Sequence, residues 1–165
     1  VDAGALDAAP GSFALTACLA STHALGGLAP TIARLAELTR PGGWVLVGDG
    51  YWRRPPEAPY LEALGAAADE LPDYAALVRA GEAAGLRSVS VLAATQEEWD
   101  AYEWTLIGNG ERRLAAAPDD PLAGALRGWV DAARDRYLAP GGRDTLGFAI
   151  VLYRRPGVLY APPPC

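Results

Sequence analysis

Three groups of residues carry side chains suited to chemistry. Ser21-Thr22-His23 brings two hydroxyls and the only imidazole of the chain, which could act as a general base near neutral pH. Tyr51 and Trp52 could line a substrate pocket, and the adjacent Arg53-Arg54 could hold an anion through paired hydrogen bonds. A plainer interpretation is open for each group: a hydroxyl-capped strand end, packing beneath a loop, or a solvated charge pair.

Apolar runs precede these groups and predict buried parallel strands. Residues 13–20 and 44–48 are almost entirely apolar, as expected of strands covered on both faces. Between them, residues 28–38 have leucine and isoleucine at helical spacing, and Pro41-Gly42-Gly43 ends that helix. A strand, helix, strand unit implies parallel pairing with a right-handed crossover. Ligands of such sheets bind beyond the carboxyl ends of the strands, which selects Asp2-Ala3, residues 20–23 and residues 49–52.

The rest of the chain continues this alternation of helices and strands. Residues 60–84 are expected to be helical with a break near residues 71–72, and residues 88–93 and 146–153 predict two further strands. Thr95 and Glu98 fit a capping box, whose helix is expected to break at residues 108–110 before a second helix starts at Asp120-Pro121. We therefore expect one domain over residues 1–157, with a helical insert or lid over 96–140, and a Pro-rich tail over 158–165.

The insert carries aromatic side chains with different expected roles. Trp99, Tyr102 and Leu106 recur at helical spacing and are predicted to pack in the core of the insert. Trp104 lies off that stripe and is the candidate for a contact between the lid and a substrate.

Composition and charge restrict the possible partners. The chain has 165 residues, a net charge of −6 and no basic stripe, which disfavours nucleic acid and anionic membrane surfaces. No apolar run is long enough to cross a bilayer, and the start Val1-Asp2-Ala3-Gly4 lacks the basic segment of a signal peptide, so we expect none. Cys18, Cys165 and a single histidine do not suffice for a zinc site, and they fit a reducing, cytoplasmic setting.

The first 52 residues resemble a class I S-adenosylmethionine-dependent methyltransferase, entered at the end of its third strand. Four features match in order: the turn Val1-Asp2-Ala3, the strand start at residues 11–15, the helix stop at residues 38–43 and the strand at residues 44–49. The later strands match the last two of that family, of which the final one is antiparallel and inserted beside the fifth. The implied fold class is an α/β, Rossmann-like methyltransferase sheet, incomplete at its N-terminal side, with a helical insert before its last strand.

The resemblance also implies site residues and a cofactor, S-adenosyl-L-methionine, without a metal. Asp2 would accept a hydrogen bond from the adenine amino group, and Ala3 would offer its backbone N–H to the ring. Ala20, Ser21 and Thr22 would pass beneath the methionine end of the cofactor, with His23 as the candidate catalytic base. The acceptor would be bound by three aromatic side chains, of which the first two could also shield the sulfonium: Tyr51, Trp52 and Trp104.

Part of the expected cofactor pocket is not in this sequence. The family's glycine-rich loop and the acidic residue after its second strand would both precede Val1, and Ala14 stands where that family usually has aspartate. Methyl transfer from a sulfonium is an in-line displacement, which depends on alignment and on exclusion of water more than on a fixed catalytic triad. The acidic composition and the aromatic residues favour a small-molecule acceptor.

Two other functions stay open at this level. A methyltransferase-like module could bind a partner without catalysis. A different Rossmann-like enzyme, such as a dehydrogenase or hydrolase, would need a G-x-G-x-x-G or G-x-S-x-G motif, and neither is present. If strands before residue 13 are missing, residues 13–20 form an apolar sheet edge, so we expect self-association or cover by an N-terminal segment.

Overall fold

A computed structural model describes residues 7–157, and its contacts divide the chain into two compact units. Among the described residues, the first unit comprises 7–50, Tyr74–Ala93 and 148–157, and the second comprises Tyr51–Asp73 and Ala94–Gly147. No helix within the described residues has the length and apolar character to cross a membrane.

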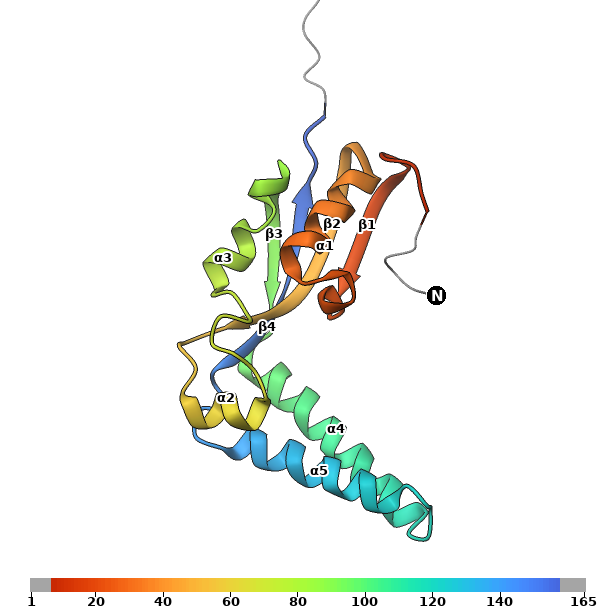
Figure 1. Ribbon diagram of the computed structural model, residues 1–165, viewed down its shortest axis with the longest axis vertical. Helices are drawn as coiled ribbons and strands as arrows, with labels where there is room; N and C mark the ends of the chain where they lie inside the picture. Colours follow the sequence, from red (N-terminus) through yellow and green to blue (C-terminus); the bar gives the residue numbers. More distant parts are fainter. Residues whose placement is uncertain (1–6, 158–165) are drawn as a thin grey trace, which may run out of the picture. The chain divides into compact units, whose positions relative to one another are not determined.

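A mixed sheet forms the centre of the first unit. Its four strands within the described residues are β1 (Phe13–Leu19), β2 (Thr39–Trp52), β3 (Arg87–Ala93) and β4 (Leu146–Arg154), in the order β1-β2-β4-β3. β1 pairs in parallel with β2, and β4 pairs antiparallel with β3. Figure 1 shows β4 running against the other three strands, which confirms the predicted antiparallel last strand inserted beside β2.

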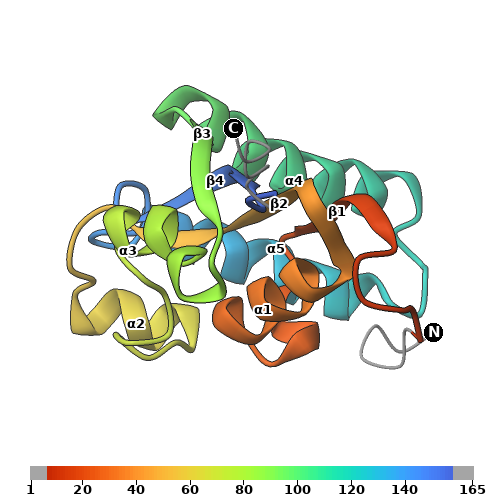
Figure 2. The same ribbon diagram turned by 90° about the horizontal axis from the view of Figure 1, so that it is seen from above.

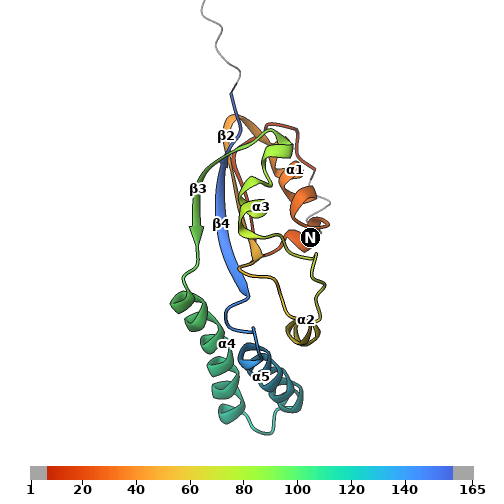
Figure 3. The same ribbon diagram turned by 90° about the vertical axis from the view of Figure 1, so that its left-hand side faces the viewer.

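Helices cover one face of this sheet. α1 (Leu28–Leu38) and α3 (Tyr74–Arg79) lie on the same side of it in Figures 2 and 3. Strand side chains alternate between faces, and one set is fully buried: Val45, Val47, Val151 and Tyr153. The Tyr153 hydroxyl also donates to the Leu77 carbonyl of α3 at 2.8 Å.

β1 is a strand, as predicted, but the expectation that it is covered on both faces is wrong for the described residues. Leu15 and Leu19 are 54% and 47% exposed, whereas Thr16 is buried. An apolar run permits burial on both faces, but the helices of the first unit lie on one side of the sheet only (Figure 3).

The predicted helix stop at residues 41–43 lies within a strand. α1 ends at Leu38, as expected, and β2 begins at once with Thr39 instead of at Trp44. Gly42 and Gly43 each form a backbone hydrogen bond of 3.0 Å with Arg155, so the turn is paired with the end of the sheet. A Cβ on Gly43 would lie 2.5 Å from the Thr39 methyl group, which explains the need for glycine there.

The second unit contains a helical hairpin. α4 (Gln96–Ala116) and α5 (Ala123–Leu138) lie side by side in Figure 1 and share the buried residues Ile107, Leu114, Val130 and Ala133. The predicted break at residues 108–110 is wrong, because α4 continues through it. A Cβ on Gly110 would lie 2.3 Å from Val130 Cγ2, so this glycine permits a close approach of the two helices and does not end one.

Several local signals lie close to their predicted places. The capping box of Thr95 and Glu98 is present with both of its hydrogen bonds. The helical region splits into α2 (Ala58–Leu64), α3 and a short 3-10 turn, η3 (Glu82–Ala84), with the expected break between α2 and α3. Asp120 accepts the Leu122 N–H at 2.9 Å, although α5 itself starts at Ala123.

Candidate active site

The parallel pairing of β1 with β2 ends at the carboxyl end of β1, beside Gly48, and β2 continues to Trp52. Leu19 pairs with Gly48, and the Ala20 N–H donates to the Gly48 carbonyl at 2.8 Å. The residues that follow β1 therefore lie beside Asp49 of β2, at the carboxyl end of the parallel pair, where open α/β sheets bind ligands. Residues 20–23 from the first turn and Asp49 from β2 form what we call the strand-end site.

A hydrogen bond joins the two sides of the strand-end site. Thr22 begins the 3-10 turn η2 (Thr22–Leu25), is buried, and donates its hydroxyl to Asp49 Oδ2 at 2.6 Å. The Gly50 N–H donates to Asp49 Oδ1 at 2.8 Å, so both carboxylate oxygens are fixed. From α1, the Thr31 hydroxyl donates to the Thr22 carbonyl at 3.1 Å. The bond of 2.6 Å from the Thr22 hydroxyl to the Asp49 carboxylate is charge-assisted, and such bonds are among the stronger hydrogen bonds of proteins.

The sequence analysis predicted no role for Asp49, although residues 49–52 were expected to lie at the ligand-binding edge of the sheet. A single aspartate after a strand is not a motif, and only the parallel pairing of β1 with β2 brings it to Thr22. The negative charge of Asp49 also affects Cys18 on β1. Burial is the main cause that raises the pKa of the Cys18 thiol, and the Asp49 carboxylate raises this pKa further. A hydrogen bond with the Ser21 backbone lowers this pKa in part.

Ala20 adopts a strained backbone at this edge. Its φ of 53° makes it the only non-glycine residue of the described chain in the left-handed region. That conformation costs an L-residue about 1–2 kcal/mol, and such strain clusters at functional sites. A role of Ala20 in binding the cofactor stays a prediction.

Ser21 and His23 are both exposed at the same edge. The Ser21 hydroxyl donates to the Leu19 carbonyl at 3.2 Å, and the His23 carbonyl accepts the Gly26 N–H at 3.2 Å. Within residues 7–157 the His23 imidazole has no hydrogen-bond or ion-pair partner, so no neighbouring carboxylate orients it as a base. Asp2 and Ala3, the predicted adenine-binding residues, lie outside the described residues.

The predicted acceptor residues belong to the second unit. Tyr51 and Trp52 are buried there, and the Trp52 indole N–H donates to the Ala68 carbonyl at 2.9 Å. Trp104 is 46% exposed and meets the Tyr137 ring edge-on, with centroids 6.3 Å apart. Their role in binding an acceptor stays a prediction.

The prediction that Tyr102 packs in the core of the hairpin is wrong. Tyr102 is 54% exposed and stacks on Trp99 at the helix surface, with ring centroids 5.3 Å apart, instead of packing in the core. The core lies one helical face away, around Ile107 and Val130, because small residues such as Gly110 allow close contact there.

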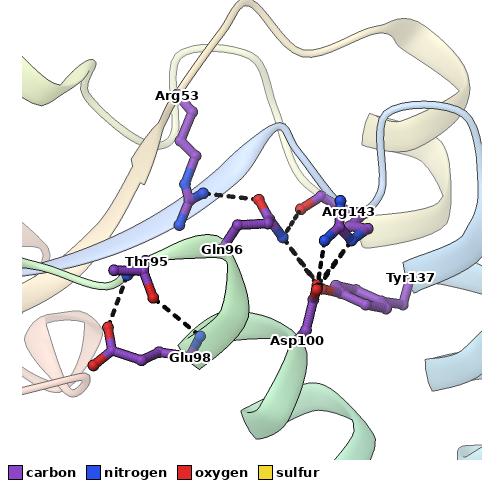
Figure 4. A network of polar contacts seen from close by, with 7 residues as sticks. All are labelled: Arg53, Thr95, Gln96, Glu98, Asp100, Tyr137 and Arg143. Carbon is purple, nitrogen blue, oxygen red and sulfur yellow. Dashed lines mark hydrogen bonds and ion pairs between the residues drawn. The ribbon is translucent and has the colours of Figure 1, made fainter.

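In the second unit, a polar network connects Arg53, the start of α4, the end of α5 and Arg143 (Figure 4). Arg53 donates to the Gln96 side chain at 2.8 Å and to the Ala94 carbonyl at 2.9 Å, so it is a structural residue and not the solvated charge expected from the sequence. Gln96 donates to Asp100 at 3.0 Å, and Asp100 also accepts from Tyr137 and Arg143. The hydrogen bond from Arg143, followed by those from Tyr137 and Gln96, holds the pKa of the Asp100 carboxyl well below its ordinary value.

Known proteins similar to this chain were found by sequence and by structure. No protein-family model matches it. The uncharacterized protein YjhP of Escherichia coli K12 is 32% identical over 138 residues, which cover 82% of this chain and 55% of the relative. The crystal structure of YjhP matches with a TM-score of 0.81 and 30% identity, over 93% of this chain and 62% of that one.

Two solved structures carry a more informative description. S-adenosylmethionine-dependent methyltransferases from Geobacter sulfurreducens and Thiobacillus denitrificans, each in complex with S-adenosyl-L-homocysteine, match with TM-scores of 0.81 and 0.80. They are 30% and 28% identical to this chain, cover 93% of it, and are themselves covered over 61% and 62% of their length. The chain thus spans somewhat more than half the length of the relatives that it matches, and it has the fold of class I S-adenosylmethionine-dependent methyltransferases.

Proposed function

We propose that this chain carries part of the site of an S-adenosylmethionine-dependent methyltransferase that acts on a small-molecule acceptor. One observation carries the proposal: Thr22, which follows β1, is hydrogen-bonded to Asp49 of β2 at the carboxyl end of the parallel pair, where this fold class binds its ligands. The similarity to methyltransferases crystallised with S-adenosyl-L-homocysteine supports the choice of cofactor.

The proposed roles are those that the resemblance to the methyltransferase family implies. Asp2 and Ala3 bind the adenine, Ala20, Ser21 and Thr22 pass beneath the methionine end, and His23 is the candidate base for an acceptor that must lose a proton. Tyr51, Trp52 and Trp104 line the acceptor pocket. The cofactor supplies an activated methyl group with a neutral leaving group, so the work of the chain is to orient the acceptor and exclude water.

Nuclear magnetic resonance of the isotopically labelled chain tests this proposal. Titration with S-adenosyl-L-homocysteine at up to millimolar concentration should shift the amide signals of residues 20–23 and 49–50. The amides of residues 117–123, at the far end of the hairpin, serve as the internal control and should not move. No saturable shift, or shifts confined to the hairpin, would contradict the assignment of the site.

The exposed side of β1 favours one alternative, an interaction module without catalysis. β1 is the last strand at its edge of the described sheet, and Phe13, Leu15 and Leu19 are all exposed. A second copy could pair with the same edge by two-fold symmetry. Sedimentation of the chain and of Leu15→Lys, together with the titration above, separates the two functions. A dimer that is lost in the variant, without S-adenosyl-L-homocysteine binding in either protein, favours the module.

A further inference from the structure

We propose that Asp49 determines the specificity of the strand-end site by binding an amine acceptor, so that the methyl group is transferred to nitrogen. The inference rests on the function proposed above and names the substrate class of the same site.

The geometry of Asp49 is that of a prepared anionic ligand. Thr22 donates to one carboxylate oxygen at 2.6 Å and Gly50 to the other at 2.8 Å, which fixes the orientation of the group. An ionised carboxylate offers about four acceptor sites, so roughly two are left for another donor. The side chain is half-buried and lies directly at the carboxyl end of the parallel pair β1 and β2.

The charge of Asp49 lacks a counter-ion within residues 7–157, where the carboxylate forms no ion pair. Two other half-buried aspartates each bind an arginine: Asp100 binds Arg143, and Asp120 binds Arg113. A partly desolvated carboxylate without a cation is costly, and a cationic ligand would offset this cost. The site therefore favours a positive ligand over a neutral or anionic one.

Methyl transfer to an amine places positive charge where a carboxylate is most useful. The bound ammonium group first loses a proton to solvent, and the neutral nitrogen then attacks with its lone pair. The new nitrogen–carbon bond forms, and the carbon–sulfur bond breaks with its electron pair left on sulfur. The positive charge thereby moves onto the nitrogen, and a fixed carboxylate beside it stabilises the developing charge. A phenolate or carboxylate acceptor would instead meet repulsion from Asp49.

Binding of matched probes to the chain saturated with S-adenosyl-L-homocysteine tests the proposal without any requirement for turnover. Benzylamine, which is cationic at pH 7, and the neutral benzyl alcohol have the same ring and differ in charge. We expect benzylamine to shift the amide signals of Thr22 and Gly50, and to bind at least ten times more tightly than benzyl alcohol. Asp49→Asn should remove this preference, whereas Asp7→Asn, which removes an exposed aspartate of the same unit, should not.

Other outcomes identify where the reasoning fails. Equal binding of the two probes to the native chain would overturn the proposal even if Asp49→Asn did not fold. If Asp49→Asn weakens S-adenosyl-L-homocysteine itself by ten times or more, the carboxylate binds the amino group of the cofactor, and the assignment to the acceptor is wrong. If the native chain does not bind S-adenosyl-L-homocysteine at all, the proposed function fails first.

Discussion

Replacement of Thr22 by valine tests the hydrogen bond that joins the two sides of the strand-end site. Valine keeps the volume and branching of threonine, so the buried side chain still fills its place and only the hydroxyl is lost. The lost bond of 2.6 Å ends on a carboxylate, and hydrogen bonds to charged groups contribute about 1.5–3 kcal/mol. Because Asp49 is half-buried and water can replace part of this bond, we expect a loss near the lower end of that range.

Equilibrium urea unfolding measures this loss. Far-ultraviolet circular dichroism and tryptophan fluorescence should be followed together, since the chain has two units and a single free energy requires coincident transitions. Thr39→Val is the matched control at the amino end of β2. Its buried hydroxyl forms two hydrogen bonds, with the Leu35 carbonyl and the Thr16 hydroxyl, both at 2.7 Å and both neutral. Their loss should cost about 0.5–1.5 kcal/mol for each bond.

A double-mutant cycle isolates the pair itself. Thr22→Val and Asp49→Asn should be non-additive by at least about 0.5 kcal/mol, as expected for residues in direct contact. The reasoning is refuted if the two losses are additive, or if Thr22→Val costs no more per hydrogen bond than Thr39→Val.

Three further predictions concern the helical hairpin, the Asp100 network and the backbone of Ala20. Gly110→Ala should destabilise the hairpin by about 1–3 kcal/mol in urea unfolding, because the new Cβ would lie 2.3 Å from Val130 Cγ2. The control Gly124→Ala in α5, where the new Cβ meets open space, should instead stabilise the hairpin by about 0.5–1 kcal/mol. Asp100 has a lowered pKa in the folded chain, so its contribution to folding stability is complete above about pH 4 and is lost as the pH falls below that value. Asp100→Asn should therefore flatten the fall of the thermal unfolding midpoint between about pH 4 and 2. An unchanged fall of the midpoint over this pH range would contradict the prediction. Ala20→Gly should stabilise the chain by up to about 1 kcal/mol through relief of its left-handed backbone, and a loss of stability would argue against strain at that position.

Local signals in the sequence were sufficient for much of the fold. The apolar runs predicted the strands, and Thr95 with Glu98 predicted a capping box, because these features depend on side-chain alternation and on contacts three residues apart. The ordered motifs of residues 11–49 also indicated the fold family, and the antiparallel final strand followed from that resemblance.

Long-range contacts decided what the sequence alone could not. Glycine usually ends a helix, yet α4 continues through Gly110, because the decisive contact is with Val130 on the next helix. The bond between Thr22 and Asp49 joins residues 27 positions apart, and it exists only because β1 and β2 pair in parallel with Leu19 opposite Gly48. Periodicity identifies which residues share a face of an element, but only the packed neighbours determine whether that face is covered.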